Sequence, residues 1–119
     1  MRSFRVTRIY TGDDGESHFE DLELPLTDRG VIGAISSLQE ATGVAFRETA
    51  GDYDFDFHRA PRRQYVINLD AAVEIEIGDG TRRLLEPGSV LLAEDTGGRG
   101  HRSRAVDGKP RRSIFVTLD

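Results

Sequence analysis

The chain has 119 residues, of which 37% are hydrophobic and 31% charged, so it fits one compact domain over residues 1–119 with no room for a second. The net charge is −5 and the 16 basic residues are scattered, which makes nucleic acid and anionic membranes unexpected partners. There is no cysteine, which excludes disulfides, thiolate nucleophiles and cysteine-ligated metal sites.

The first five residues lack the apolar core of a secretory signal, and no later stretch approaches the roughly 20 apolar residues that a membrane span needs. We therefore expect a soluble, cytoplasmic protein. Turn-forming residues then follow one another at short intervals, which predicts many brief strands rather than a few long helices. These turn signals lie at residues 12–15, 78–80, 86–89, 97–100 and 107–110.

Between the turns lie short runs rich in β-branched and aromatic residues. The predicted strands are residues 63–69, 73–77, 81–85, 89–93 and 113–118, with a hairpin turn at residues 78–80. Only residues 33–41 have helical spacing, and the glycines around them also allow a loop. Because a single antiparallel sheet would leave an apolar face in water, the strands must pack as two sheets or close on themselves. The sequence thus predicts an all-β jelly roll or small barrel.

Polar and apolar residues alternate most clearly between Gly51 and His58. With the period of two that a strand has, Asp54, Asp56 and His58 are expected on one face, and the two phenylalanines between them on the other. The same reasoning places Gln64, Val66 and Asn68 together on one face of the next strand.

From this point the chain resembles the cupin superfamily, and in particular the small single-domain cupins (the cupin 2 type conserved barrel). The positions of the first cupin motif, a glycine, a His-x-His pair, a glutamate and a closing glycine, are taken here by Gly51, His58, Ala60, Gln64 and Ala71. The second motif is similar to residues 87–95, followed by a glycine-rich loop and His101. The resemblance implies a double-stranded β-helix, or jelly-roll cupin barrel, with one pocket.

Cupins commonly hold one divalent metal, such as iron, manganese, nickel or zinc, through three histidines and a glutamate inside the barrel. His58 and His101 are the two histidines that this sequence keeps. Gln64, at the glutamate's position, would offer a neutral carbonyl oxygen. Alternatively Asp56 would recreate the paired motif as Asp-x-His, giving two histidines and one carboxylate. Asp56 also has a purely structural interpretation, as a charged residue on an edge strand that discourages pairing with another chain.

Further residues have both a functional and a structural interpretation. Arg62, Arg63 and Asn68 are the candidates for substrate binding, although such an arginine pair is more often a solvated surface pair. Glu48 is a candidate general base only if its strand turns it inward. The loop of Glu94 and Asp95 that leads to His101 is either a lid over the barrel or a surface turn. His18, in a polar stretch, is expected at the surface.

Three functions follow from these residues. The first is a metal-dependent enzyme, a dioxygenase, isomerase or lyase acting on a small polar metabolite, with His58, His101 and either Gln64 or Asp56 around the ion. The second is a metal-free acid–base enzyme like the epimerases and cyclases of the superfamily, using one histidine beside Asp56 or Glu48. The third is a non-catalytic module that binds a small molecule.

Two partner predictions complete the interpretation. The glycine-rich loop at residues 97–100 lacks the Lys-Ser/Thr of a phosphate-binding loop, so no nucleotide cofactor is expected. The face of the strand opposite the pocket contains Tyr65, Ile67 and Leu69. These side chains need a second apolar surface to pack against, so the chain is predicted to form a homodimer.

Overall fold

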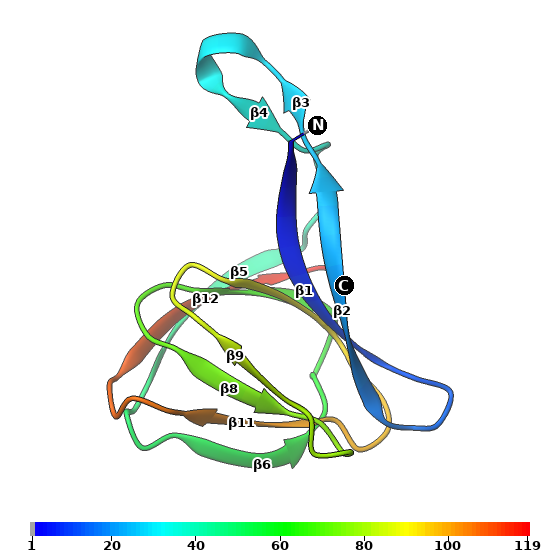
Figure 1. Cartoon of the computed structure of the whole chain (residues 1–119), viewed down its shortest axis with the longest axis vertical. Helices are drawn as coiled ribbons and strands as arrows, with labels where there is room; N and C mark the ends of the chain where they lie inside the picture. Colours follow the sequence, from blue (N-terminus) through cyan, green and yellow to red (C-terminus); the bar gives the residue numbers. More distant parts are fainter. Residues whose placement is uncertain (1) are drawn as a thin grey trace.

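The computed structural model describes residues 2–119, whose strands form two larger sheets and one two-stranded arm (Figure 1). The larger sheet has the order β2-β1-β10-β7-β12-β5 and the smaller one the order β6-β11-β8-β9. The six strands of the larger sheet are β2 (Ser17–Pro25), β1 (Ser3–Thr11), β10 (Val90–Glu94), β7 (Gln64–Asn68), β12 (Arg111–Thr117) and β5 (Gly43–Thr49). The smaller sheet contains β6 (Asp54–His58), β11 (His101–Ala105), β8 (Val73–Glu76) and β9 (Arg82–Leu85).

The chain is a jelly roll, which confirms the predicted all-β class. The strand pairs of the two larger sheets are antiparallel except for β1 and β10, which run parallel. All five predicted strands are present as β7, β8, β9, β10 and β12, with ends within two residues of the prediction. The hairpin turn between β8 and β9 is also confirmed, since Gly80 has a φ of 90° and donates to the carbonyl of Ile77.

The strands β1 and β2 form a long hairpin that hydrophobic periodicity did not reveal. They pair over all nine residues of each strand, from Ser3 with Pro25 to Thr11 with Ser17. Val6 and Ile9 are both buried although they point to opposite faces of β1, because Ile9 belongs to the core and Val6 borders the outer side of the sheet. A strand that buries residues on both faces shows no period of two.

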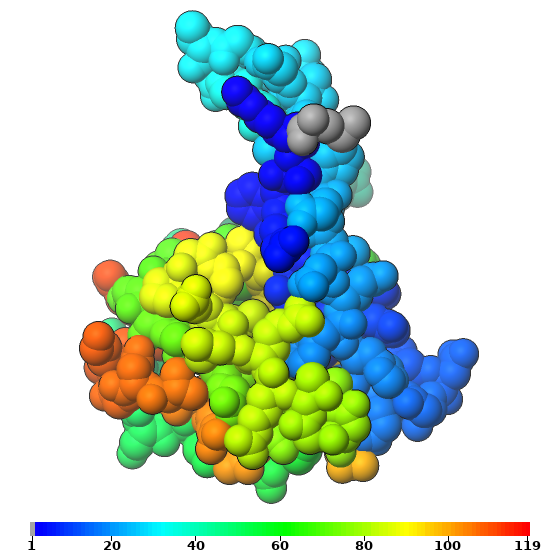
Figure 2. Space-filling model, viewed as in Figure 1, coloured from blue at the N-terminus to red at the C-terminus, as the bar shows by residue number. Residues whose placement is uncertain are grey.

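The stretch with helical spacing is not a helix. A single 3-10 turn (Gly30–Ile32) is followed by β4 (Ala34–Ile35), which pairs with β3 (Thr27–Asp28), and residues 36–42 have no regular structure. Gly30 and Gly33 have positive φ values of 73° and 96°, which a right-handed helix does not allow. This arm stands away from the barrel in the space-filling view (Figure 2). Within residues 2–119 no helical segment has the length and apolarity to cross a membrane.

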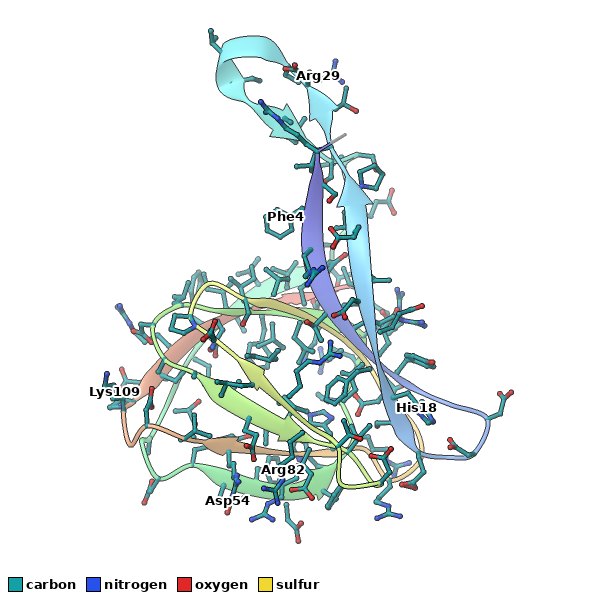
Figure 3. The ribbon with its side chains drawn as sticks, viewed as in Figure 1. Phe4, His18, Arg29, Asp54, Arg82 and Lys109 are labelled. Carbon is teal, nitrogen blue, oxygen red and sulfur yellow. The ribbon has the colours of Figure 1, made fainter. Side chains whose placement is uncertain are left out.

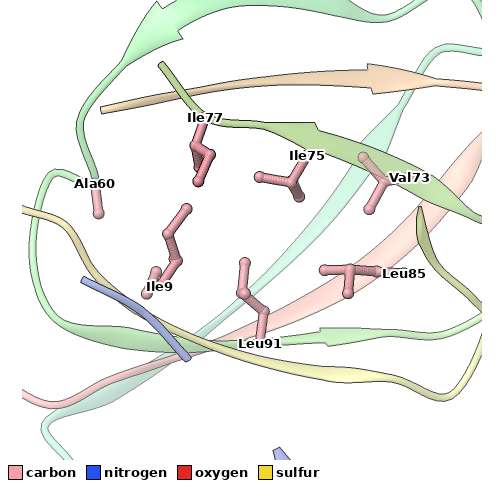
Figure 4. Close-up of a cluster of buried hydrophobic side chains, with 8 residues drawn as sticks. Ile9, Ala60, Val73, Ile75, Ile77, Leu85 and Leu91 are labelled. Atoms are coloured by element: carbon pink, nitrogen blue, oxygen red, sulfur yellow. The ribbon is translucent and has the colours of Figure 1, made fainter. Parts of the chain in front are cut away.

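The hydrophobic core lies between the two larger sheets. Its buried side chains come from β1, β8, β9 and β10 and from the segments after β6 and β8, and they point toward one another in Figure 4. The members of this cluster are Ile9, Ala60, Val73, Ile75, Ile77, Leu85, Leu91 and Ala93. At roughly 1.5–3 kcal/mol for each large side chain removed from water, this cluster supplies the main apolar stabilisation of the barrel.

Candidate functional site

A cavity of about 220 Å³ lies inside the barrel beside the core. That volume equals about seven water molecules at roughly 30 Å³ each, so it suits a small metabolite. The exposed residues on its wall, Arg47, Phe55 and Pro61, lie on or next to the edge strands β5 and β6, which places the mouth there. The deeper wall contains Tyr53, His58, Gln64, Val66, Asn68, Val73, Ile75, Leu85, Ser89, Leu91, His101, Ser103, Arg111 and Phe115, among others.

The two histidines singled out in the sequence lie side by side on this wall. His58 ends β6 and His101 begins β11, and the register pairs them directly. Their ring centroids are 4.6 Å apart, and the ring of Phe55 stacks on His58 at 3.8 Å. The Nδ1 atom of His58 lies 2.8 Å from the carbonyl oxygen of Asp56, which can only accept, so Nδ1 donates and Nε2 is left free.

A buried carboxylate orients the second histidine. The Nδ1 atom of His101 donates to Oδ2 of Asp95 at 2.6 Å, and the Ser17 hydroxyl donates to the same oxygen at 2.7 Å. Asp95 is fully buried and His101 is 7% exposed. Asp95 therefore holds the ring of His101 so that Nε2 is its free nitrogen, on the wall of the cavity.

A β-bulge changes the faces predicted for β6. Opposite β11, His58 pairs with His101 and Phe55 with Ser103, so Asp56 and Phe57 together face the single residue Arg102. The predicted shared face of Asp54, Asp56 and His58 is therefore wrong, because the extra residue turns His58 to the side of Phe55. Asp54 points away from the barrel and pairs with Arg102 at 2.8 Å (Figure 3). Asp56 is exposed, and one of its oxygens accepts from the backbone of Phe57.

The predicted inward face of β7 is present. Gln64, Val66 and Asn68 all line the cavity, and the first and last of these are 5% and 3% exposed. The side-chain amide of Asn68 donates to the carbonyls of Ala71 and Leu85, so it fastens the turn after β7. Its Oδ1 is buried without a partner in the described chain and is the part of Asn68 that remains for a ligand.

The other candidate residues lie outside the cavity. Arg63 is exposed and pairs with Glu94 at 2.7 Å, and Arg62 is exposed in the loop before β7. Glu48 is exposed on β5, where its backbone pairs with that of Arg112. None of these residues borders the cavity, so the structure brings together His58, His101, Gln64 and Asn68 and leaves Asp56, Glu48, Arg62 and Arg63 apart from them.

Three site residues escaped the sequence analysis. The sequence places Asp95 in a lid or surface loop. The alternation of polar and apolar residues cannot indicate that a residue beyond the end of a strand turns inward. Arg111 stood just before the predicted strand at residues 113–118; extending that strand by two residues would have placed it on the inner face with Ser113 and Phe115. Tyr53 lies in the loop before β6, where its hydroxyl is 2.7 Å from that of Ser103.

Burial and neighbouring charge set the protonation of the cavity wall. Burial lowers the pKa of His58, and the nearby His101 and Arg47 lower it further against the opposing effect of the hydrogen bond to Asp56. His58 is therefore neutral at neutral pH. Burial also lowers the pKa of the Arg111 guanidinium, and Arg47 acts in the same direction, although an arginine keeps its charge in proteins.

The donor set falls short of the metal centre that the cupin resemblance implies. His58 and His101 offer one nitrogen each, and Gln64 adds a neutral amide oxygen, which is a weak ligand for a divalent ion. The bulge has removed Asp56 from this set. Within residues 2–119 no group of three histidine, aspartate or glutamate side chains is arranged to hold a metal. The residues on the cavity wall therefore do not fit a resident divalent metal.

Comparison with known proteins identifies similar folds but no close relative. No protein-family model matches the sequence, and no curated protein sequence matches it. Among solved structures, the Schizosaccharomyces pombe Cnp3 cupin domain is similar with a TM-score of 0.53 and 9% identity, over 100% of this chain and 86% of that one. A putative ethanolamine utilization protein Q from Salmonella typhimurium has a TM-score of 0.50 and 9% identity, over 99% and 98%. Protein NMB1881 from Neisseria meningitidis has a TM-score of 0.50 and 14% identity, over 70% and 84%.

Proposed function

We propose that this chain, which has the fold of a small cupin, binds a small metabolite in its barrel and moves a proton on it without a metal. One observation carries the proposal. His101 lines the cavity with a free Nε2 while its Nδ1 donates at 2.6 Å to the fully buried Asp95. An imidazole that a carboxylate orients from behind is a recurring arrangement for general acid–base catalysis.

Each member of this cluster has a distinct part in the proton transfer. The Nε2 atom of His101 takes the proton from the bound molecule, and Asp95 stabilises the imidazolium that forms while keeping the ring in place. Ser17 donates to Asp95 and is 1% exposed, so the carboxylate cannot turn away from the ring. His101 then returns its proton from Nε2 to the molecule at the same or at a neighbouring atom.

His58 complements His101 from 4.6 Å away. Because its pKa is lowered, it stays neutral when His101 becomes charged, and its free Nε2 accepts a hydrogen bond from the bound molecule. The pair thus keeps one base and one neutral hydrogen-bond acceptor beside the reacting atoms.

Solvent exchange of deuterium tests the proton transfer directly. The protein is incubated in D₂O with a panel of small organic acids and sugars, and the loss of substrate C–H signals is followed by NMR. We expect catalysed exchange with at least one compound, lowered by about 10²–10⁴-fold in His101→Ala. Asp95→Asn should lower the rate as well, since it weakens the orienting bond. His18→Ala is the control, because His18 pairs with Asp14 beside the β1–β2 turn (Figure 3).

Metal analysis decides between this function and the metal-dependent one. Protein purified without a polyhistidine tag, and offered iron, manganese, nickel and zinc, should hold less than about a tenth of an ion per chain. Close to one ion per chain, lost in both His58→Ala and His101→Ala, would contradict the metal-free proposal. Ligand binding with no exchange in any compound would instead favour a binding module.

A further inference from the structure

The cavity wall contains a buried positive charge that no acidic side chain among residues 2–119 pairs with. Arg111 begins β12 and is only 6% exposed, and it is the one buried arginine or lysine among residues 2–119. Its guanidinium forms no hydrogen bond and no ion pair with any side chain of these residues. The adjacent Arg112, by contrast, is exposed and pairs with Asp70 at 2.7 Å.

The surroundings of Arg111 add positive charge rather than compensate it. Arg47, on the neighbouring strand β5, lines the same cavity. The guanidinium carbons of Arg111 and Arg47 lie 5.6 Å and 5.7 Å, respectively, from the ring centroid of Tyr53. No aspartate or glutamate of the described chain is among the residues that line the cavity. Buried charges in proteins are normally paired, so this arrangement lacks an anion.

Further unpaired polar atoms lie around the same cavity. The Ser89 hydroxyl and Oδ1 of Asn68 belong to lining residues, and both are buried without a partner in residues 2–119. Buried polar atoms in folded proteins usually have partners, so these two atoms on the cavity wall are available to a bound molecule. Apolar side chains form much of the rest of the wall, with Val66, Val73 and Phe115 among them.

We propose that Arg111 binds the carboxylate of a small organic acid whose apolar body fills the cavity. The planar guanidinium matches a carboxylate with two parallel hydrogen bonds, and Arg47 at the mouth attracts the anion. The aromatic rings of Tyr53, Phe55 and His58 follow one another at 6.4 Å and 3.8 Å along the wall. They lead from Arg111 to His101, so a molecule anchored at Arg111 presents its other end to the histidines.

This inference rests on the proposed function only where it calls the bound acid a substrate. Binding of the acid is measured without any turnover. Affinities of benzoate and hexanoate are compared by NMR titration with those of the neutral benzamide and hexanamide. We expect each carboxylate to bind about tenfold or more tightly than its amide, because a hydrogen-bonded charge is lost in the amide. Arg111→Met should abolish that difference, and Arg112→Met, the matched neighbour outside the cavity, should retain it.

A second readout does not depend on the choice of probe. Without ligand, Arg111→Met should melt at a higher temperature than the parent, because an unpaired buried charge is replaced by an apolar side chain of similar length. A lower melting temperature for Arg111→Met would overturn the inference, since it would show that the folded chain itself satisfies the guanidinium. Equal affinity of carboxylates and amides, or no carboxylate binding up to about 10 mM, would overturn it too. So would tighter binding of inorganic phosphate than of any carboxylate.

The two proposals fail in different ways. Carboxylate binding that depends on Arg111, without deuterium exchange, supports the anion site and removes the proton-transfer function. Exchange that continues unchanged in Arg111→Met supports proton transfer and removes Arg111 as the substrate anchor.

Discussion

Asp95 is the residue on which the site depends most. It accepts from both Ser17 and His101 with one oxygen, and it is fully buried. Asp95→Asn replaces a charged acceptor by an amide in a place that water does not reach. Its cost is expected at about 1–3 kcal/mol of unfolding free energy, measured by urea denaturation.

Asp54→Asn is the matched control for that substitution. Asp54 also pairs with a basic side chain, Arg102, but both groups are exposed to solvent. Solvent screens an exposed ion pair and leaves it little net contribution to stability, so this variant should denature close to the parent. Equal losses in the two variants would show that Asp95 has no special role.

The lowered pKa of His58 predicts how stability changes with pH. The folded protein holds the proton of His58 less tightly than the unfolded chain, whose histidine has the ordinary pKa of 6.5. Between these two pKa values the unfolded chain binds more protons, so the free energy of unfolding falls as the pH falls. The contribution is fully present above pH 6.5 and is lost as the pH decreases through the folded pKa.

His58→Gln tests this dependence, because it removes the titrating group. The urea midpoint is measured for both proteins at several pH values between about 5 and 7.5, a range in which histidines titrate. The midpoint of the parent should decrease more steeply toward acid than that of the variant. Parallel curves would contradict the assignment.

At the scale of elements, the contact between β6 and β11 positions both histidines. Gly100, immediately before β11, has a φ of 80°, and a Cβ there would meet the backbone carbonyl of His58. Gly100→Ala should therefore push β6 from β11, separate the two imidazoles and cost more than about 1–2 kcal/mol. Gly80→Ala is the control, because it has a φ of 90° but open space around it.

The measurement combines denaturation with NMR spectra of the histidine rings. Gly80→Ala should show only the strain of a positive φ, with the ring signals of His58 and His101 unchanged. Gly100→Ala should shift both. Unchanged ring signals in Gly100→Ala would contradict the close fit between these two strands.

Sequence patterning predicted β7, β8, β9, β10 and β12 but missed the hairpin of β1 and β2, and it gave the inward face of β7 correctly but not that of β6. The regular alternation of β7 gave the correct inward set of Gln64, Val66 and Asn68, because that strand pairs on both sides without irregularity. In β6 the bulge shifts the faces by one residue, and parity alone cannot reveal an extra residue. For this reason the sequence predicted His58 and His101 at the site but assigned the wrong carboxylate, Asp56, in place of Asp95.

At the scale of the whole molecule, the outer side of the larger sheet and the arm expose many apolar residues. Val31, Ile32, Ile35 and Leu38 of the arm are 57% exposed or more, and Phe46 on the edge strand β5 is 79% exposed. The outward Tyr65 and Ile67 line an open apolar groove with arm residues such as Ile35. Monomeric proteins rarely expose a large contiguous apolar patch, so we expect a partner to cover this surface.

We expect a second copy of the chain to pack on this surface, in agreement with the homodimer that the sequence predicts from the outward-facing Tyr65 and Ile67. Light scattering at micromolar concentration should give the mass of a homodimer. The double variant Leu38→Asp and Phe46→Asp should be monomeric, because each charge would be buried in the interface. A monomeric mass for the parent protein would contradict the prediction.

The proposed function depends on Asp95 and His101 forming a metal-free acid–base pair open to the cavity. The most direct test is the protonation of the ring nitrogens, measured by long-range ¹H–¹⁵N NMR of the metal-free protein at pH about 8. We expect hydrogen on Nδ1 and none on Nε2 in both His58 and His101, with the His101 Nδ1 signal moved in Asp95→Asn and that of His58 nearly unchanged. Hydrogen on Nε2 of His101, or no response to Asp95→Asn, would contradict it.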